Sequence, residues 1–272
     1  MRIRDIFSEQ KDITSLDLIN IVSHALALSK ERLFANLDRE VGKEDALRIN
    51  ELIIDRKSNK PLAYITNRRE FFSYPLFINE SVLVPRPETE TLVEEALEII
   101  KNKPSPHLVL DMGTGSGAIG IIMAKKASCK VVCVDISQEA LSVARKNAIL
   151  HGIHGNMCFV CSDLFGGIKE AKKFDMVLAN LPYVAEEDWE NLQADVRMFE
   201  PRVALDGGKY GMEVYRKFVA ALPCYLKSGG QVLCEIGNDL QGYRMRNMLE
   251  SLGLKASIKE DLAGKQRVVV AT

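Results

Sequence analysis

Short apolar runs alternate with helical segments from residue 107 to residue 271 of this 272-residue chain. Each run is long enough for one buried strand, and amphipathic stretches separate the runs. Such alternation predicts an α/β fold, in which a doubly wound, mostly parallel sheet carries helices on both faces. The expected strands are 107–112, 130–135, 157–161, 174–179, 231–236, 255–258 and 266–271.

The last two expected strands depart from the parallel arrangement. Only a short turn, Lys259 to Gly264, separates them. Parallel neighbours need a crossover of a dozen or more residues, so we expect these two strands to pair antiparallel. The prediction is therefore a seven-stranded sheet with an antiparallel C-terminal strand. The expected helices in this region are 89–100, 138–150, 212–226 and 240–252, together with one that follows a glycine-rich turn at 113–120 and ends near 126.

The first 70 residues show helical periodicity and no strand-like alternation. Ser15 can cap a helix that reaches Leu28, and further helices are expected at 29–36 and 43–57. The buried face of the third helix is expected to consist of Ala46, Leu47, Ile49, Ile53 and Ile54. This pattern predicts a small helical domain for partner recognition or packing.

Aromatic and β-branched residues then indicate a β-hairpin. Its expected strands are 70–78 and 81–84, with Asn79 and Glu80 in the turn. The predicted domains are a helical domain at 1–70, a hairpin connector at 71–85 and an α/β domain at 86–272. Two prolines, Pro85 and Pro87, hold Arg86 in a stiff segment that could form a lip over a site.

Composition excludes several classes of protein. Lys and Arg number 36 against 37 Asp and Glu, which argues against a dedicated nucleic-acid binder. No apolar run approaches the ~18 residues of a membrane span, and the N-terminus lacks an apolar signal core, so we expect a cytoplasmic protein. We expect no disulfide framework, no metal site, and buried thiols at Cys158 and Cys161.

A glycine-rich loop after the first strand predicts a nucleotide-like cofactor. Gly113, Thr114, Gly115, Ser116 and Gly117 lead into a helix, whose first N–H groups are free. The next two strands each lead to a carboxylate: Asp135 ends its strand and suits ribose hydroxyls, and Asp163 comes just after the following strand, where an adenine edge would be. The loop also fits a dinucleotide pattern, since Gly115 to Gly120 reads G-x-G-x-x-G with Asp135 about 20 residues on. The loop alone leaves NAD open.

The fourth strand ends in Asn180-Leu181-Pro182-Tyr183, at the sheet edge where ligands bind. Pro182 stiffens the turn and biases Leu181 towards an extended conformation. The Asn180 side-chain oxygen and a neighbouring backbone carbonyl are two acceptors, which suit the two hydrogens of a substrate –NH2 group. The alternative is a strand that simply ends in a polar turn.

Taken together, these motifs resemble the class I S-adenosylmethionine-dependent methyltransferases that act on amino or amide nitrogen. The closer resemblance is to the release-factor glutamine methyltransferase family, often called HemK or PrmC. Leu181 replaces the first Pro of the usual Asn-Pro-Pro-Tyr, and Leu164 replaces a Trp of some relatives. The segments that carry the resemblance are 61–65, 84–90, 111–119, 162–165, 180–183, 200–205 and 235–237.

The resemblance implies transfer of a methyl group from S-adenosylmethionine to the glutamine amide of the Gly-Gly-Gln motif in peptide chain release factors. It implies cofactor binding by the glycine-rich loop, Asp135, Asp163, Leu164 and Asn180. It implies a substrate site formed by Asn180, Leu181, Pro182, Tyr183, Arg86 and Glu88, with catalysis by Asn180, Pro182 and Tyr183. The expected partner is a release factor, and the expected state is a monomer without nucleic acid or membrane contacts.

Two alternatives stay open at this point. An adenine N6 or cytosine N4 methyltransferase would use the same Asn-Leu-Pro-Tyr corner on a flipped base. A cofactor-binding partner protein without catalysis would keep the loop and dispense with the corner.

Overall fold

The computed structural model describes residues 1–101 and 107–272, and these form two compact units. One unit comprises Met1–Arg68 together with Gln193–Phe199, a segment that the sequence patterns do not assign to it. The other comprises Arg69–Leu192 and Glu200–Thr272. Each unit has its own buried apolar cluster.

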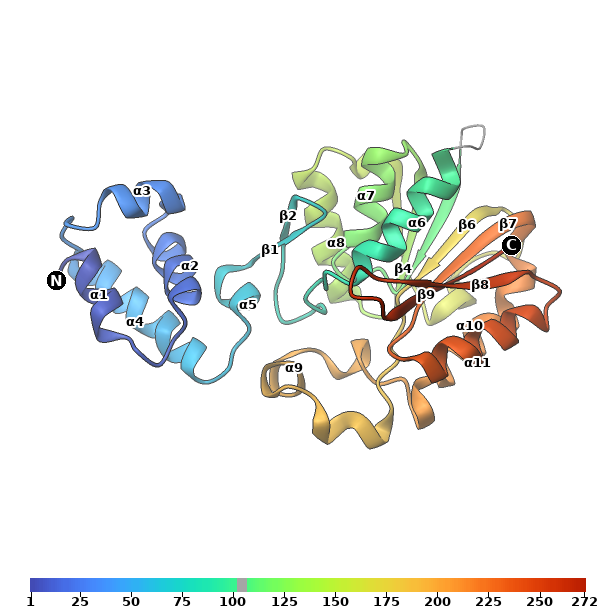
Figure 1. Ribbon diagram of the computed structural model, residues 1–272. Helices are drawn as coiled ribbons and strands as arrows, with labels where there is room; N and C mark the ends of the chain where they lie inside the picture. Colours follow the sequence, from blue (N-terminus) through green and yellow to red (C-terminus); the bar gives the residue numbers. More distant parts are fainter. Residues whose placement is uncertain (102–106) are drawn as a thin grey trace. The chain divides into compact units, whose positions relative to one another are not determined.

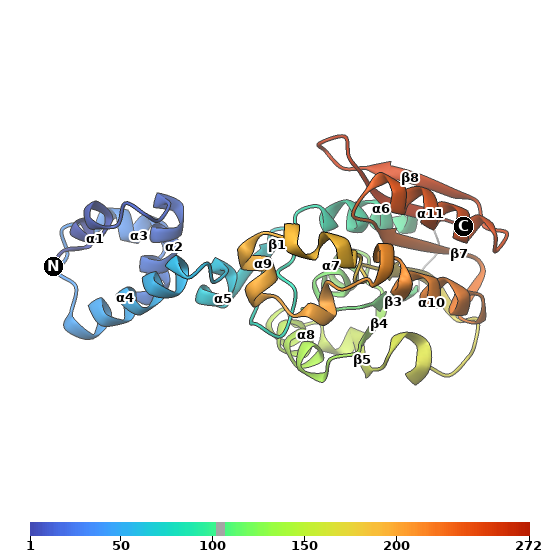
Figure 2. The ribbon, with the colours of Figure 1, turned by 90° about the horizontal axis from the view of Figure 1, so that it is seen from below.

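The N-terminal unit is helical (Figure 2). Thr14, and not Ser15, caps the second helix, because its hydroxyl accepts a hydrogen bond from the Asp17 N–H at 3.1 Å. Leu47 and Ile54 were expected to be buried and are each 65% exposed. The helix that carries them buries a narrow stripe, Ile49 and Ile53, one turn apart. The helices are α1 (Ile3–Glu9), α2 (Ser15–Ala25), α3 (Lys30–Ala35), α4 (Lys43–Lys57), α5 (Leu62–Thr66) and α9 (Ala194–Phe199).

The β-hairpin lies earlier in the chain than predicted. Its strands are β1 (Arg68–Phe71) and β2 (Tyr74–Phe77), and its turn consists of Phe72 and Ser73. Both turn residues have positive φ, 52° and 64°, which matches the twist of a two-residue hairpin loop.

The expected second strand at 81–84 does not form, because other groups take the backbone hydrogen bonds. The Asn147 side chain accepts from the Phe77 N–H at 2.7 Å and donates to the Phe77 carbonyl at 2.9 Å, which ends strand β2. The Val84 N–H donates to the Glu200 carboxylate at 3.2 Å. This segment is therefore fixed by side chains from other parts of the same unit.

The sheet of the larger unit confirms the predicted α/β fold. Seven strands lie in the order β5-β4-β3-β6-β7-β9-β8. Strands β3 to β7 are parallel, and β9 pairs antiparallel with both β7 and β8, as expected from the short turn before it. The strands are β3 (Leu108–Met112), β4 (Lys130–Asp135), β5 (Met157–Cys161), β6 (Phe174–Ala179), β7 (Leu226–Glu235), β8 (Ala256–Glu260) and β9 (Gln266–Ala271).

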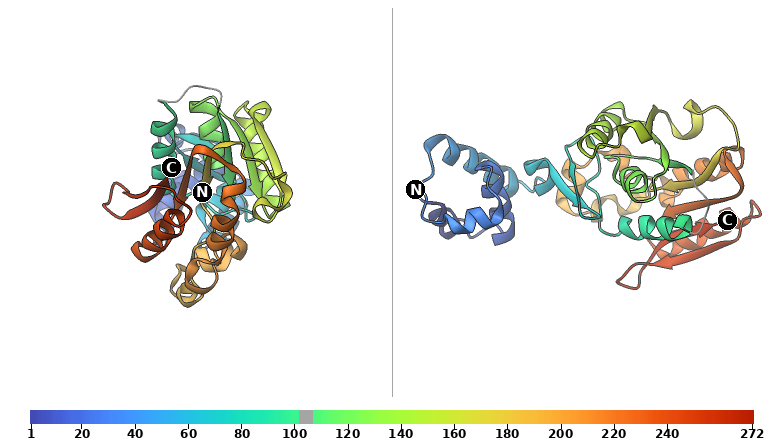
Figure 3. Two further views of the ribbon diagram at one scale, coloured as in Figure 1. Left: turned by 90° about the vertical axis from the view of Figure 1, so that its right-hand side faces the viewer. Right: turned by 90° about the horizontal axis from the view of Figure 1, so that it is seen from above.

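Helices cover both faces of this sheet (Figures 1 and 3). On one face lie α6 (Thr89–Lys101), α7 (Ala118–Lys126) and α8 (Gln138–Leu150); on the other lie α10 (Glu213–Ala221) and α11 (Asp239–Glu250). Cys158 and Cys161 are exposed and not buried, because β5 is an edge strand. Short 3-10 helices occupy His154–Asn156, Leu164–Gly167, Glu186–Asn191, Arg202–Ala204, Lys209–Gly211 and Leu222–Cys224.

Candidate active site

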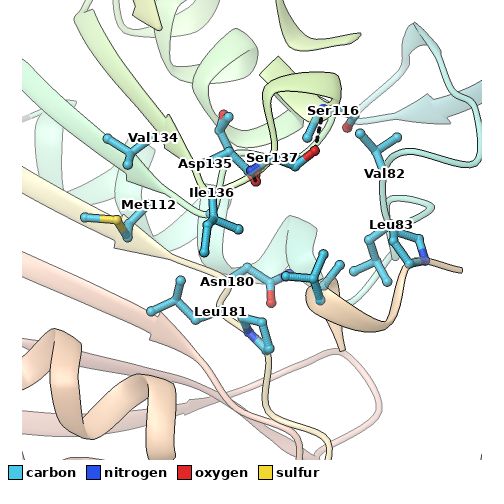
Figure 4. Close-up of a pocket in the computed structure, with 18 of the residues that line it drawn as sticks. Val82, Leu83, Met112, Ser116, Val134, Asp135, Ile136, Ser137, Asn180 and Leu181 are labelled. Carbon is cyan, nitrogen blue, oxygen red and sulfur yellow. Dashed lines mark hydrogen bonds between the residues drawn. The ribbon is translucent and has the colours of Figure 1, made fainter. Parts of the chain in front are cut away.

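A cavity opens at the carboxyl edge of the parallel strands, where the sequence placed the site (Figure 4). The loops after β3, β4, β5 and β6 each contribute to its wall, because parallel strands end at the same edge. The segment before α6 supplies a further wall. Among the predicted site residues, those that line the cavity are Arg86, Gly113, Thr114, Gly115, Ser116, Asp135, Asp163, Leu164, Asn180, Leu181 and Pro182.

Three predicted site residues are not in the cavity wall: Gly117, Glu88 and Tyr183. Gly117 begins helix α7 with φ of 82°, and a Cβ there would come within 3.1 Å of Ala144. It therefore sets the packing of α7 against α8. Glu88 is exposed at the turn before α6.

The glycine-rich loop is held by Asp135, the carboxylate at the end of β4. Asp135 Oδ2 accepts from the Gly115 N–H at 2.8 Å, and Oδ1 accepts from the Ser137 N–H at 3.0 Å. Partial burial raises the pKa of Asp135, and these hydrogen bonds oppose the rise. Each carboxylate oxygen has a second lone pair, so Asp135 can still accept hydrogen bonds from ligand hydroxyls.

A second carboxylate, Asp111, lies beneath the same loop. It is fully buried, and its Oδ2 accepts from the Thr114 hydroxyl at 2.6 Å and the Gly120 N–H at 3.0 Å. Burial raises its pKa to about 6. Its other oxygen, Oδ1, has no hydrogen-bond partner in the part of the chain that the structure describes. This buried acceptor places negative charge below a loop that would carry a cationic cofactor.

The Asn-Leu-Pro corner is fixed by two hydroxyl groups. Asn180 Nδ2 donates to Thr89 Oγ1 at 3.1 Å, and the Leu181 N–H donates to Tyr215 Oη at 3.2 Å. Tyr215 in turn donates to the Glu235 carbonyl at 2.6 Å. Leu181 is buried, so the apolar residue in place of Pro packs into the core. The corner is therefore tied both to helix α6 and to strand β7.

Tyr183 points away from the cavity in this structure. Its hydroxyl donates to Glu235 Oε1 at 3.2 Å, and a Cβ on Gly237 would come within 2.8 Å of its ring. Burial and the nearby carboxylate raise the pKa of Tyr183. Thr89, Tyr215 and Glu235 are residues that the sequence did not mark as functional. Thr89 and Glu235 lie in two of the family-like segments, whereas Tyr215 gave no signal beyond its helix.

Arg86, which lines the cavity, is bound by a buried carboxylate. Its Nη2 lies 2.5 Å from Glu200 Oε1, and the Glu200 side chain is 1% exposed. The same carboxylate accepts from Val84. The ion pair joins the segment before α6 to the segment at Pro201, Val203 and Ala204, and both line the cavity.

The donors and acceptors around the cavity fit S-adenosylmethionine. The backbone of Gly113 to Ser116 suits close approach of the ligand, and Asp135 suits its ribose hydroxyls. Leu164 and the exposed Ile136 offer apolar surface for an adenine ring. Within the described residues there is no group of three or more His, Cys, Asp or Glu side chains that could hold a metal ion.

Comparisons with known proteins identify the family of the chain. Residues 109–200 match the methyltransferase domain family, and residues 3–66 match the PrmC N-terminal domain. A release factor glutamine methyltransferase of Fusobacterium nucleatum is 35% identical over 259 residues, which cover 94% of this chain and 72% of the relative. The chain belongs to the release factor glutamine methyltransferase family.

Further comparisons extend this result over the whole chain. A release factor glutamine methyltransferase of Leptospira interrogans is 35% identical over 274 residues, covering 98% of this chain and 94% of the relative. The structure also resembles a methyltransferase from Pyrococcus furiosus, with a TM-score of 0.54 and 19% identity over 82% of this chain and 96% of that chain. That likeness shows the fold alone.

Membership of this family decides the alternatives about the cofactor. The chain is a methyltransferase that uses S-adenosylmethionine, so the dinucleotide interpretation of the loop is wrong. The nucleic-acid methyltransferase is not favoured, since the relatives are named for release factors. None of the described helices is both long and apolar enough to cross a bilayer.

Proposed function

We propose that this enzyme methylates the side-chain amide nitrogen of the glutamine in the Gly-Gly-Gln motif of peptide chain release factors. The products are N5-methylglutamine and S-adenosylhomocysteine. The observation that carries the proposal is the position of Asn180. Its side chain lies in the wall of the same cavity as the glycine-rich loop and Asp135.

An amide nitrogen is a poor nucleophile, because its lone pair is delocalised into the carbonyl. S-adenosylmethionine, when bound, supplies a methyl group activated by its cationic sulfonium. The protein has to hold the amide in line and to stabilise positive charge on nitrogen. Asn180 Oδ1 and the carbonyl of Leu181 or Pro182 accept the two amide hydrogens and so aim the nitrogen.

The other residues of the site have supporting roles in this proposal. The loop from Gly113 to Ser116, with Asp135, Asp163 and Leu164, holds the cofactor, and Gly117 supports the loop by starting helix α7. Pro182 keeps the corner stiff. Arg86 and Glu88 form the lip through which the glutamine enters, and the Arg86 pair with Glu200 fixes that lip. Tyr183, which the sequence suggested as a contact of the amide, supports the corner from behind through Glu235.

We also propose that the helical residues 1–70 recognise the body of the release factor. In this proposal residues 86–272 carry out catalysis, and the enzyme works as a cytoplasmic monomer without direct nucleic-acid contact. The near-neutral composition supports this choice over a nucleic-acid substrate.

The experiment that tests the proposal uses purified release factor and S-adenosylmethionine with a labelled methyl group. We expect one methyl group per release factor, located by mass spectrometry on the glutamine of Gly-Gly-Gln. A release factor with Gly-Gly-Glu is the matched control, because the glutamate carboxylate has no N–H groups that could donate hydrogen bonds to Asn180. Equal labelling of both proteins would contradict the proposal, as would cofactor binding with no transfer to any release factor.

A further inference from the structure

The orientation of the Asn180 side chain is set by two residues that the sequence did not mark as functional: Thr89, which lines the cavity, and Glu235, which does not. An asparagine carboxamide has nearly the same shape after a half-turn about its last bond, yet that turn exchanges an acceptor for a donor. In this structure the nitrogen faces Thr89, at 3.1 Å from its hydroxyl. The oxygen is then the end left for the substrate.

A flipped Asn180 would present hydrogens to the hydrogens of the substrate amide. A threonine hydroxyl cannot prevent this alone, because it can accept from the Asn nitrogen or donate to the Asn oxygen. The choice depends on what the single Thr89 hydrogen binds. Thr89, at the first position of α6, lines the cavity but is only 4% exposed, so the neighbouring protein groups matter more than bulk solvent.

The group that decides it is Glu235, at the end of the neighbouring strand. Ala179 of β6 is paired with Cys234 of β7, so the residues that follow them, Asn180 and Glu235, end adjacent strands. The Glu235 carboxyl is buried, and it interacts with the hydroxyls of Thr89 and Tyr183, both of which stabilise its charged form. Its Oε2 has no well-formed hydrogen bond within the described residues, which leaves capacity for the Thr89 hydrogen.

We propose that Glu235 and Thr89 are positioning residues that hold Asn180 with its nitrogen on Thr89 and its oxygen towards the substrate amide. A carboxylate only accepts hydrogen bonds, so it draws the Thr89 hydrogen to itself. The Thr89 lone pair is then available only to the Asn180 nitrogen. This inference rests on the proposed function, and it adds the two residues that orient Asn180 for the same reaction.

Protonation of Glu235 would exchange donor and acceptor in the hydrogen bonds that link Glu235 to Thr89 and Thr89 to Asn180. A neutral carboxyl can donate to Thr89, whose hydrogen is then free for the oxygen of a flipped Asn180. Burial raises the pKa of Glu235 to about 7. Arg267 on β9 lowers the pKa of Glu235, and so do the hydroxyls of Thr89 and Tyr183. Glu88, before α6, raises it. Tyr215 on α10 donates a hydrogen bond to the Glu235 backbone carbonyl.

The first test compares Thr89→Val with Thr89→Ser in methylation of release factor at saturating cofactor and substrate. We expect Thr89→Val to lower kcat on the order of 10–100-fold, with cofactor affinity within about 2-fold of wild type. Thr89→Ser keeps the hydroxyl and should stay within about 3-fold. Thr91→Val, the same change two residues further along α6, is the matched control. An unchanged kcat in Thr89→Val, or an equal loss in Thr89→Ser, would overturn the proposal.

The second test is the dependence of kcat on pH. We expect the wild-type kcat to fall as pH drops through about 7, and Glu235→Gln to have a lower kcat without that acidic fall. Glu250→Gln, an exposed control, should keep it. An acidic fall that persists in Glu235→Gln, or that wild type lacks, would refute the role of Glu235. Failure of wild type to methylate any release factor would instead reject the proposed function, so the two failures are distinguishable.

Discussion

Gly113 of the cofactor loop lies so close to Leu181 of the substrate corner that no side chain fits between them. A Cβ on Gly113 would lie 3.1 Å from Leu181 Cδ2 and 3.3 Å from the Asn180 carbonyl oxygen. The two motifs are 68 positions apart in number, from 113 to 181, yet they share one surface because β3 and β6 are neighbouring parallel strands. Cofactor and substrate geometry are therefore coupled through the backbone.

Gly113→Ala should reduce both turnover and cofactor affinity. Its φ is 73°, a conformation that strains any residue with a Cβ, and the added methyl group would press on the corner. We expect each quantity to fall by about 10-fold or more, measured by steady-state kinetics and by calorimetric titration with S-adenosylmethionine. Gly155→Ala is the control, since φ there is not positive and a Cβ would meet nothing within 4 Å. Unchanged affinity in Gly113→Ala would disprove the coupling.

Arg86→Ala should destabilise the larger unit more than an ordinary surface change. It removes the cation beside Glu200, whose side chain is 1% exposed. Loss of one partner of a buried ion pair typically costs about 3 kcal/mol, measured here as the free energy of unfolding in urea. Arg202→Ala removes an exposed pair with Asp206 and should cost less than about 1 kcal/mol. Similar losses in the two variants would contradict the structural role of the Arg86 pair.

Glu235→Gln should stabilise the protein at alkaline pH while it slows turnover. The pKa of Glu235 is about 7 in the fold in place of 4.5, so the folded state pays an ionisation cost that the unfolded state does not. That cost is absent below about 4.5, grows as pH rises through the interval and is complete above about 7. The full difference corresponds to about 3 kcal/mol.

Urea unfolding of Glu235→Gln and wild type at about pH 5 and about pH 8.5 measures this difference. Because the Gln side chain makes weaker hydrogen bonds than a carboxylate, we expect a gain of about 1–3 kcal/mol at the higher pH and little at the lower. Glu250→Gln, at an exposed position of α11, should show no such dependence. A loss of stability at the higher pH would mean that the charged Glu235 side chain does not destabilise the folded state.

The sequence predicted the sheet well because each buried strand is an unbroken apolar run. The bounds of β4, β5, β6 and β9 agree with the expected ranges. The hairpin was misplaced because its position depends on side chains distant in sequence. Asn147 and Glu200 take the hydrogen bonds that a longer hairpin would have needed, and no local pattern records this.

In the site, too, the residues next to a strand could be predicted from the sequence, whereas the residues that come from distant elements could not. The glycine-rich loop, Asp135 and Asn180, which line the cavity, could be marked from the sequence because each lies at the end of an expected strand or directly after it. Thr89 contacts Asn180 from helix α6, and Glu235 interacts with Thr89 from the end of strand β7, so their part in the site appears only in three dimensions. The direction of the Tyr183 side chain likewise depends on a carboxylate 52 residues away.

The central claim is that Asn180 aims a carboxamide at the activated methyl group, and single-turnover kinetics of Asn180→Ala with release factor measure it most directly. We expect the rate of methyl transfer to fall on the order of 10²–10³-fold, because one preorganised acceptor is lost. The dissociation constant of S-adenosylmethionine, measured by calorimetry on the same protein, should change by less than about 5-fold. A transfer rate that falls no more than cofactor affinity does would show that Asn180 only builds the cofactor pocket, and would contradict the account.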